Sequence, residues 1–230
     1  MTVAILQARM SSTRLPGKVM KPLAGRPMIE RQLERLRRCV TLQRIIVATS
    51  LEASDDPLAA HLGALGIDVF RGSLADVLDR YVAAARAFKI AGQVVRLTAD
   101  CPLADPEVID ACVRLHAELG VDYCSNGRRR TFPHGLDVEA FGLDALLVAH
   151  CEATDPYDRE HVTPFLYRNP DRFTQGELVQ ARDESHLRWT VDTPEDFAFV
   201  ERVYAALYPA KPDFTSDDVR ALPFSHVAPA

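Results

Sequence analysis

Short apolar runs alternate with amphipathic stretches along the first hundred residues. Four of the runs have no polar face and read as buried strands, at residues 3–6, 44–49, 67–70 and 93–98. Between them, apolar residues recur at helical spacing at 29–40, 55–66 and 73–88. Alternating strands and helices predict an α/β fold in which helices cover both faces of a mostly parallel sheet.

The pattern changes after residue 100. A helix is predicted at 106–119, a short strand at 122–125 and another helix from Leu143. Polar, basic and aromatic stretches within residues 126–180 break the simple alternation. Farther on, the run at 187–191 reads as a strand that ends at Asp192.

Composition limits the class of protein. The 230 residues, of which 47% are hydrophobic, suffice for one α/β domain over residues 1–230. The five cysteines are odd in number and form no C-x-x-C pair, which argues against disulfides and zinc and favours the reducing cytoplasm. No apolar run resembles a signal peptide or could span a membrane. The formal net charge of -5 argues against nucleic acid as a partner.

The loop after the first strand gathers positive charge in an otherwise acidic chain. Five cations precede the first acidic residue of the chain: Arg9, Arg14, Lys18, Lys21 and Arg26. The same loop offers the hydroxyls of Ser11, Ser12 and Thr13. Such a loop suits a polyphosphate, although a solvated basic loop is the plain alternative. Walker A is excluded because it needs glycine at Ser12 and Ser or Thr at Val19, and no G-x-G-x-x-G is present.

Three stretches carry a resemblance to a known family. Gln7-Ala-Arg-Met-Ser-Ser-Thr-Arg-Leu-Pro-Gly-Lys18 resembles the signature loop of the CMP-sugar-acid synthetases, cytidylyltransferases that activate acidic sugars with CTP. Residues 132–141 and 158–170 resemble the SpsF-like branch, named for spore coat polysaccharide synthesis. The resemblance implies a Rossmann-like, three-layer nucleotide-diphospho-sugar transferase fold. In that fold, roughly residues 126–180 would form the acceptor side of the cleft and a dimerisation arm.

The resemblance also implies which residues bind the nucleotide. They are Gln7, Ala8, Arg9, Ser11, Ser12, Thr13, Arg14, Lys18, Arg71 and Arg80. Arg9, Arg14 and Lys18 would neutralise the β- and γ-phosphates of CTP, and Arg14 and Lys18 are counted as catalytic. Apart from the resemblance, Asp76 and Arg80 read as a helical i,i+4 ion pair, and both interpretations stay open.

Two aspartates are the candidates for a Mg²⁺ site. Asp100 follows the fourth apolar run and Asp192 follows the run at 187–191, so both are expected at strand ends over the sheet. Mg²⁺ commonly takes only one or two carboxylates and fills its other positions with phosphate and water. The resemblance makes Asp100 and Asp192 metal ligands and catalytic residues. Otherwise Asp100 would cap a turn and Asp192 the helix that starts at Pro194, with Asp196 in its first turn.

The acceptor side is assigned by resemblance. Its candidate residues are His134, Asp137 and Glu139. The basic stretch 128–130 reads either as solvated charge or as a contact to a substrate carboxylate.

The arm is the second consequence of the resemblance. Glu160 and His161 fall in it and read as structural. The aromatic and apolar residues between Tyr157 and Tyr167 look too costly to expose in a monomer, which predicts a homodimer built partly on this arm.

The reaction that fits these residues is nucleotidyl transfer. An oxygen of an acidic sugar or related acid would attack the α-phosphorus of CTP and release pyrophosphate, in surface polysaccharide or glycan precursor synthesis. Two alternatives stay open: an NDP-sugar pyrophosphorylase acting on a sugar 1-phosphate, and a non-catalytic nucleotide-binding protein. A KDO cytidylyltransferase is disfavoured, because the Gly-Thr-Asp-Arg expected there is Val77-Leu-Asp-Arg80 here. The sequence leaves the acceptor itself open.

Overall fold

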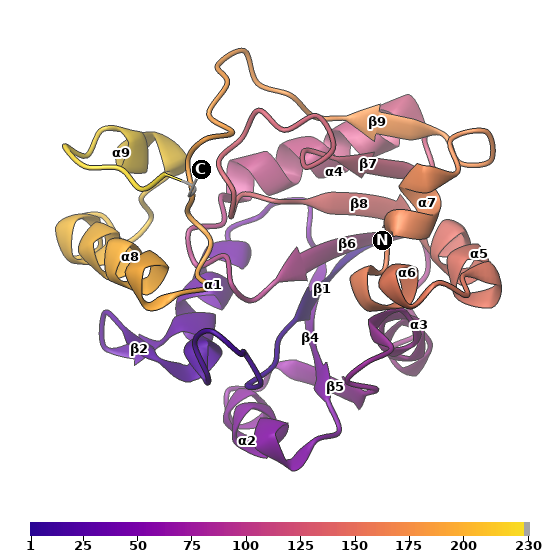
Figure 1. The fold of residues 1–230 in the computed structure, drawn as a ribbon, viewed down its shortest axis with the longest axis horizontal. Coiled ribbons are helices and arrows are strands. Elements are labelled where there is room, and N and C mark those ends of the chain that lie inside the picture. The colour runs from indigo at the N-terminus through magenta and orange to yellow at the C-terminus, as the bar shows by residue number, and fades with distance from the viewer. Residues whose placement is uncertain (228–230) are drawn as a thin grey trace.

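The computed structural model describes residues 1–227 and holds a seven-stranded sheet with helices on both faces (Figure 1). From one edge to the other, the strands are β5 (Asp68–Gly72), β4 (Arg44–Ser50), β1 (Thr2–Gln7), β6 (Gln93–Thr98), β8 (Glu139–Gly142), β7 (Tyr123–Ser125) and β9 (Gln175–Glu177). A separate two-stranded ribbon pairs β2 (Pro22–Leu23) with β3 (Arg26–Pro27).

The helices of residues 1–227 fall between and after these strands. They are α1 (Met28–Leu36), α2 (Asp56–Ala64), α3 (Val77–Ala87), α4 (Pro106–Leu119), α5 (Leu143–Glu152), α6 (Pro156–His161), α7 (Pro164–Arg168), α8 (Pro194–Leu207) and α9 (Ser216–Arg220). Short 3-10 turns lie at η1 (Lys18–Met20) and η2 (Ala53–Asp55). No helix in this part of the chain is both long and apolar enough to cross a membrane.

The sheet is mostly parallel, which confirms the predicted fold class. β5, β4, β1 and β6 run parallel as neighbours, and β9 is parallel to β7. β8 reverses the direction, because it is antiparallel to both β6 and β7. Its register pairs Glu139 with Arg96 on one side and with Ser125 on the other. The amino end of β8 therefore lies next to the carboxyl ends of β6 and β7.

Alternate side chains of β1 enter two different cores, one on each face of the sheet. Val3 and Ile5 pack with α3, α5 and α7. Ala4 and Leu6 pack with α1, α2 and α4. All four side chains are fully buried, which explains why this strand reads as a continuous apolar run. The two cores separate the molecule into three layers.

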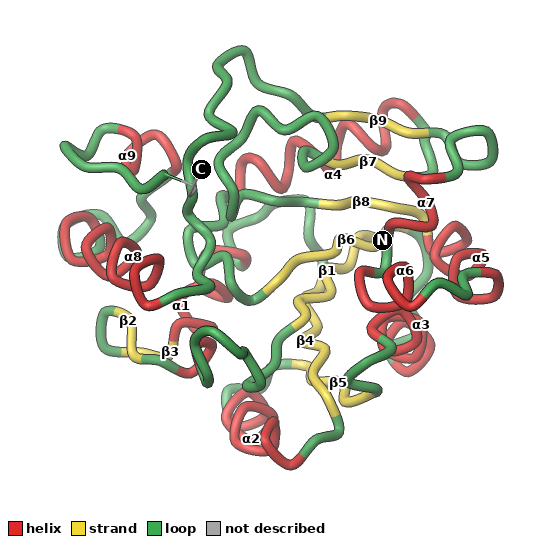
Figure 2. The backbone as a smooth tube through the Cα atoms, viewed as in Figure 1, coloured by secondary structure: helices red, strands yellow, loops and turns green. Residues whose placement is uncertain are grey.

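The predicted strand at 187–191 is wrong. Figure 2 shows that the chain between β9 and α8 is loop throughout. Within residues 1–227 its β-type pairing is limited to isolated bridges, from Arg188 to His134 and from Leu187 to Val227, and the Val191 N–H donates to the Asp100 carbonyl at 2.7 Å. Its apolar residues are buried for another reason, since Trp189 packs against α8 and α9 in a third core. An apolar run buried by helices has the same pattern as a buried strand.

Helix α3 begins later than the predicted position at residue 73. Asp76 caps it by accepting a hydrogen bond from the backbone N–H of Asp79 at 2.9 Å. Ser73 in turn accepts one from the N–H of Asp76 at 3.0 Å. Such short polar side chains bond to the nearby backbone in competition with the helix, so residues 73–76 form a capped turn.

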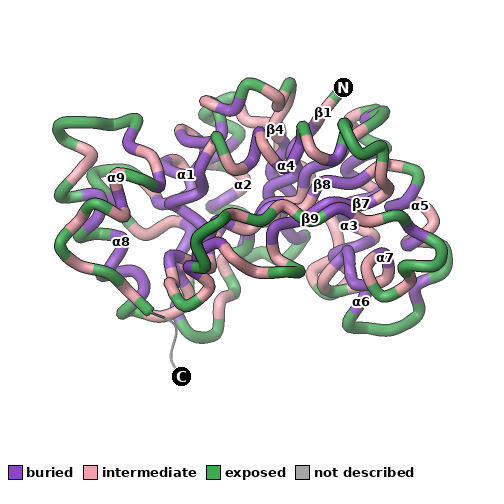
Figure 3. The backbone as a smooth tube through the Cα atoms, turned by 90° about the horizontal axis from the view of Figure 1, so that it is seen from above, coloured by how far each residue is buried: buried purple, intermediate pink, exposed green. Residues whose placement is uncertain are grey.

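The arm helices α6 and α7 lie against α3 and α5 (Figure 3). Val162 and Leu166 have no exposed surface, and only Tyr157 among the apolar residues of 157–167 is largely exposed, at 46%. The chain itself therefore covers most of the apolar surface that motivated the predicted homodimer. The homodimer stays a prediction without that argument.

Candidate functional site

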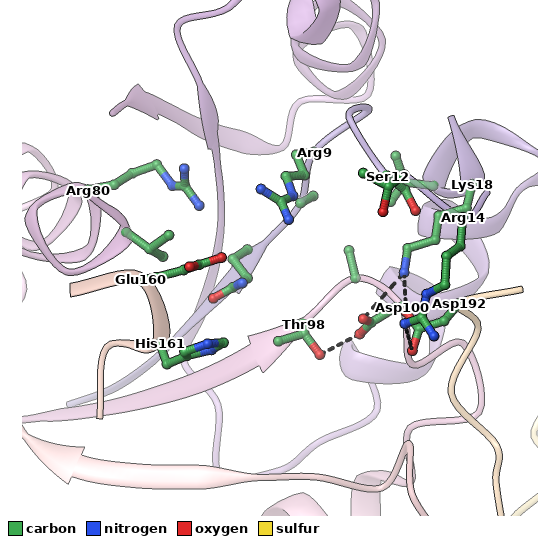
Figure 4. Close-up of a pocket in the computed structure, with 16 residues that line it drawn as sticks. Arg9, Ser12, Arg14, Lys18, Arg80, Thr98, Asp100, Glu160, His161 and Asp192 are labelled. Carbon is green, nitrogen blue, oxygen red and sulfur yellow. Dashed lines mark hydrogen bonds and ion pairs between the residues drawn. The ribbon is translucent and has the colours of Figure 1, made fainter. Parts of the chain in front are cut away.

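A cavity of about 220 Å³ opens at the carboxyl ends of β1 and β6 (Figure 4). Its lining comes from the basic loop, the end of β6, α3, α6 and the segment before α8: Gln7, Ala8, Arg9, Ser12, Thr13, Arg14, Lys18, Val19, Val77, Arg80, Thr98, Ala99, Asp100, Glu160, His161 and Asp192. Most of the predicted nucleotide-binding residues are thus brought together. Ser11 and Arg71 are the two that do not line it.

The basic loop is shaped by its own backbone and by one buried carboxylate. Gly17 lies in the left-handed region, with φ of 69°, and its N–H donates to the Met10 carbonyl at 2.9 Å. The Met10 N–H donates to Asp55 at 2.7 Å. Burial opposes the charge of Asp55, but hydrogen bonds from Ser50 and Met10 outweigh it and lower the pKa of this carboxyl. Asp55, predicted only to begin a helix, therefore anchors the basic loop.

Lys18 joins two aspartates that lie far apart in the sequence. Its ammonium is 2.9 Å from Oδ1 of Asp192 and 3.4 Å from Oδ2 of Asp100. It also donates to the Val191 carbonyl at 2.7 Å, and Arg14 lies 3.2 Å from Oδ2 of Asp192. Burial opposes the charge of Asp192, but the hydrogen bond and charge of Lys18 outweigh it, so the pKa of Asp192 is lowered. This carboxylate is ionised at neutral pH.

The two carboxylates suit a divalent cation. They face one point, where the ammonium of Lys18 now lies. Residues 1–227 hold no group of three or more His, Cys, Asp or Glu side chains placed to bind a metal. Two oxygen ligands fit an ion that completes its coordination with phosphate and water, as Mg²⁺ commonly does. Asp100 and Asp192 are the residues that could hold it.

Neither of the capping roles considered for Asp100 and Asp192 is found in the described part of the structure. Thr193, not Asp192, caps α8, and it forms a capping box with Asp196. Asp196 lies in the first turn of that helix, as predicted. The carboxylate of Asp100 accepts a hydrogen bond from the Thr98 hydroxyl at 2.6 Å, instead of capping the turn that follows.

Arg80 lies at the opposite end of the cavity from Lys18 (Figure 4). The predicted ion pair between Asp76 and Arg80 is absent from the described chain, because Asp76 pairs with Arg159 of α6 at 2.6 Å. Arg80 is only 2% exposed and donates to the Ser73 carbonyl at 2.6 Å, while its Nε has no partner within residues 1–227. Burial lowers the pKa of Arg80. The guanidinium of Arg80 therefore lines the cavity as a buried cation.

Glu160 and His161 also point into this end of the cavity (Figure 4). They were predicted to be structural, and no local pattern marks them as site residues. The backbone turns sharply directly after His161. Val162 has φ of 73° and ψ of −54°, and the Thr163 N–H donates to the His161 carbonyl at 2.9 Å. This is a γ-turn of the strained type, and it is rare for a β-branched residue.

Arg71 serves the fold near the site. Its guanidinium donates to the carbonyls of Ser50 and Glu52 at 2.9 and 3.0 Å, and it lies 2.7 Å from a carboxylate oxygen of Asp56. These three partners tie the end of β5 to the start of α2. They leave Arg71 outside the cavity that Arg80 lines.

A second cavity, of about 340 Å³, adjoins the first and shares Thr98 and Asp100 with it. It contains the three predicted acceptor residues, His134, Asp137 and Glu139. The chain between β7 and β8 forms one wall and is clamped at its base. Asn126 donates to the Leu136 carbonyl at 2.7 Å and accepts from the Val138 N–H at 2.9 Å.

The charges in the second cavity are almost all paired. Glu139 pairs with Arg96, and Asp137 pairs with Arg130. Arg128 is the exception among the arginines that line this cavity, because within residues 1–227 it has no carboxylate partner. Its guanidinium instead lies over the Tyr167 ring of α7, 4.1 Å from the ring centre.

His134 lies in the same cavity and is held in its neutral form. Burial, followed by the charge of Arg130, lowers the pKa of this imidazole. Its backbone N–H donates to the Leu187 carbonyl at 2.9 Å, which links the second cavity to the segment that carries Asp192.

Most of the chain is similar to known cytidylyltransferases. Residues 3–211 match the profile of the family described as cytidylyltransferase. An uncharacterized protein of Methanocaldococcus jannaschii is 39% identical over 197 residues, 85% of this chain and 79% of its own. Spore coat polysaccharide biosynthesis protein SpsF of Bacillus subtilis is 34% identical over 208 residues, 87% and 85% of the two chains. A solved cytidylyltransferase from Leptospira borgpetersenii superposes with a TM-score of 0.89 at 34% identity, covering 95% of this chain and 92% of its own.

Proposed function

The chain belongs to the cytidylyltransferase family of nucleotidyltransferases, and we propose that it transfers CMP from CTP to a small acidic acceptor with release of pyrophosphate. The observation that carries the proposal is the meeting of two cavities at Asp100. One cavity is lined by four cations, Arg9, Arg14, Lys18 and Arg80, and by hydroxyl donors that suit phosphate, and the other has one cation left without a carboxylate. A donor nucleotide and an acidic acceptor would then meet at the carboxylate that lines both.

The nucleotide would lie along the first cavity. Its polyphosphate belongs at the end that holds Arg14 and Lys18, because these cations neutralise the charge of the leaving pyrophosphate. The ribose and cytosine then fall at the end of Arg80, where Glu160 offers a hydrogen-bond acceptor and Arg80 a positive charge. That division leaves the α-phosphorus near Asp100.

The proposal includes Mg²⁺ held by Asp100 and Asp192. Bound there, the ion would supply positive charge to the phosphate oxygens of the nucleotide. The protein's own residues position the reactants. Arg14 and Lys18 would orient the phosphates, and the hydrogen bond from the Thr98 hydroxyl orients the carboxylate of Asp100, which lines both cavities.

The acceptor would be an acid whose carboxylate binds Arg128. This guanidinium already has its face on Tyr167, so its edge is free to donate two parallel hydrogen bonds. One unpaired cation balances the single charge of a carboxylate better than the nearly two charges of a sugar 1-phosphate. The charge count therefore favours an acidic sugar or related acid over the substrate of an NDP-sugar pyrophosphorylase.

Two further assignments belong to this proposal. A reducing cytoplasm suits the five cysteines, which are all free thiols, including Cys112 and Cys124 with their sulfurs 4.0 Å apart. The homodimer rests on the resemblance of the arm alone, and sedimentation velocity at micromolar concentration tests it.

The experiment is a coupled assay of pyrophosphate release. The protein is incubated with CTP, Mg²⁺ and each of a panel of sugar acids, non-sugar acids and sugar 1-phosphates. Release that requires both CTP and a free acid supports the proposal, and the CMP ester is identified by phosphorus NMR. Release with sugar 1-phosphates alone would favour the pyrophosphorylase, and CTP binding without release from any acceptor would favour a non-catalytic protein.

A further inference from the structure

We propose that the C-terminal tail, residues 224–227, is part of the active site, and that His226 positions the carboxylate of Asp192 through Asp196 and Arg188. The inference rests on the proposed function, since it concerns one of the two aspartates assigned to the metal. The family profile ends at residue 211, so the tail lies outside the part of the chain that defines the family.

The centre of the arrangement is Asp196. Its carboxylate accepts from Nε and Nη2 of Arg188 at 2.8 and 3.0 Å, from the N–H groups of Asp192 and Thr193 at 2.9 Å each, and from Nε2 of His226 at 2.8 Å. The side chain is 2% exposed. A buried carboxylate with every lone-pair direction in use has little freedom to move. Asp196 is therefore a fixed point beside Asp192.

Arg188 connects this fixed point to the site. Its Nη2 donates to Asp196 and also to Oδ2 of Asp192 at 2.9 Å. With Oδ2 held in this way, Oδ1 of Asp192 faces Lys18 and the cavity. The direction of the Asp192 carboxylate thus depends on where the guanidinium of Arg188 is held.

The tail contacts Arg188 through its backbone and Asp196 through the His226 ring. The His226 carbonyl accepts from the Arg188 N–H at 2.8 Å, and Val227 bridges to Leu187. The His226 ring stacks on Phe199 of α8, with centres 5.3 Å apart and planes at 21°. Within residues 1–227 the segment before Asp192 pairs with no strand, and its backbone is instead bridged by His134 and by the tail.

Loss of the His226 ring removes one of the five bonds to Asp196 and frees Arg188 to shift. Partners of metal ligands typically contribute about 10- to 100-fold to metal affinity or activity. His226 acts one residue farther away, so an effect of about 3- to 10-fold is expected from the same principle. The loss should affect Mg²⁺–CTP affinity alone, whereas a general loss of structure would lower CTP affinity with or without the metal. Arg14 and Lys18 keep their access to the phosphates when Asp192 loosens, so affinity for metal-free CTP should not fall.

The experiment is calorimetric titration of CTP into the full chain, once with Mg²⁺ and once with EDTA, with thermal unfolding as a check. His226→Ala removes the ring, His226→Phe keeps the stacking on Phe199 without the hydrogen bond, and His226→Gln restores an N–H donor. The matched control is His150→Ala, which breaks a similar pair with Asp79, at 2.9 Å, on the α3 side of the molecule.

The expected result is a loss of about 3- to 10-fold in Mg²⁺–CTP affinity for the Ala and Phe variants, with unchanged affinity in EDTA. Gln should recover most of the loss, and the control should match wild type in both buffers. Unchanged affinities throughout, or equal losses in both buffers with a lower melting temperature, would overturn the positioning role. Absence of CTP binding and of pyrophosphate release in the wild type would contradict the proposed function, and the inference with it.

Discussion

Lys18 donates a 2.9 Å hydrogen bond from its ammonium to the carboxylate of Asp192, across 174 residues of sequence. The lysine comes from the loop after β1, and the aspartate stands just before α8. This contact closes the basic loop onto the segment that the C-terminal tail supports. It also brings opposite charges to the point where the triphosphate and its counter-ion are proposed to lie.

Replacing Lys18 by Ala should weaken CTP binding and lower kcat/KM by about 1.5–3 kcal/mol, the scale of a hydrogen bond to a charged group. The fold should survive, because Lys18 lies in the short 3-10 turn η1 and not in the sheet. Steady-state kinetics over a CTP titration measure the effect. Lys21→Ala is the control, since Lys21 belongs to the same basic stretch but lies over the Phe197 ring outside the cavity. Equal kinetics for both variants and wild type would exclude a role for Lys18 in binding the phosphates.

Replacing Asp100 or Asp192 by Asn should abolish most turnover while the fold is retained. Asn keeps the volume of the side chain but removes the charge that a divalent cation needs. The measurement is kcat over a Mg²⁺ titration, repeated with Mn²⁺, which binds such sites more tightly and should partly rescue both variants. Wild-type rates in both variants would exclude the two-aspartate site.

Replacing Arg128 by Ala should raise KM for the acidic acceptor about 10- to 100-fold and leave KM for CTP unchanged, because one charge-assisted contact to a carboxylate is lost. Lys at this position should restore only part of the affinity, since it cannot bind a carboxylate through two parallel bonds. The neighbour Arg129 does not line the cavity and provides the matched control. An Arg128 variant with the KM of wild type would remove the carboxylate assignment.

Replacing Asp196 by Asn should lower the free energy of unfolding at pH 7 by about 1.5–3 kcal/mol, because a buried charge-assisted network is broken. Burial opposes its charge, but hydrogen bonds from Arg188 and His226 outweigh it and lower the pKa of Asp196 well below the ordinary 3.8. A lowered pKa stabilises the fold above the unfolded pKa, and that stabilisation is lost as pH falls toward the folded value.

The difference between wild type and Asp196→Asn should therefore be constant from pH 5 to 8 and shrink below about pH 4. Urea unfolding at a series of pH values measures it. Asp217→Asn is the control: it breaks an exposed pair with Arg220, in which Asp217 is 90% exposed, and should change stability little. A constant difference down to pH 2 would show that the charge of Asp196 is not the cause.

The sequence was sufficient for the layers and the central strands, because burial on both faces leaves a continuous apolar run such as Val3 to Leu6. The same signal was misleading at 187–191, where Trp189 is buried by helices and not by a sheet. Helix starts were displaced where polar side chains bond to the backbone, as Asp76 does. Periodicity reports burial, and the neighbour that causes the burial is set by tertiary structure.

The composition of the site was less accessible. Residues on the basic loop could be named together because they are contiguous, and Asp100 and Asp192 because a run precedes each. Glu160 and His161 lie next to a tertiary ion pair, between Arg159 and Asp76, and next to the γ-turn at Val162. Nothing in the amino-acid sequence around Val162 indicates a positive φ.

The reversed strand β8 has a consequence for how this protein can change its choice of acceptor. Ser125 at the end of β7 pairs with Glu139 at the start of β8, and Asn126 bonds to the chain just before Glu139. Residues 127–137 therefore form a loop whose two ends are held together. Substitutions or insertions inside it can remodel the wall around Arg128 without shifting β6 or Asp100. Under the proposed function, a change of acceptor would fall within these residues, while β6 and Asp100 stay in place.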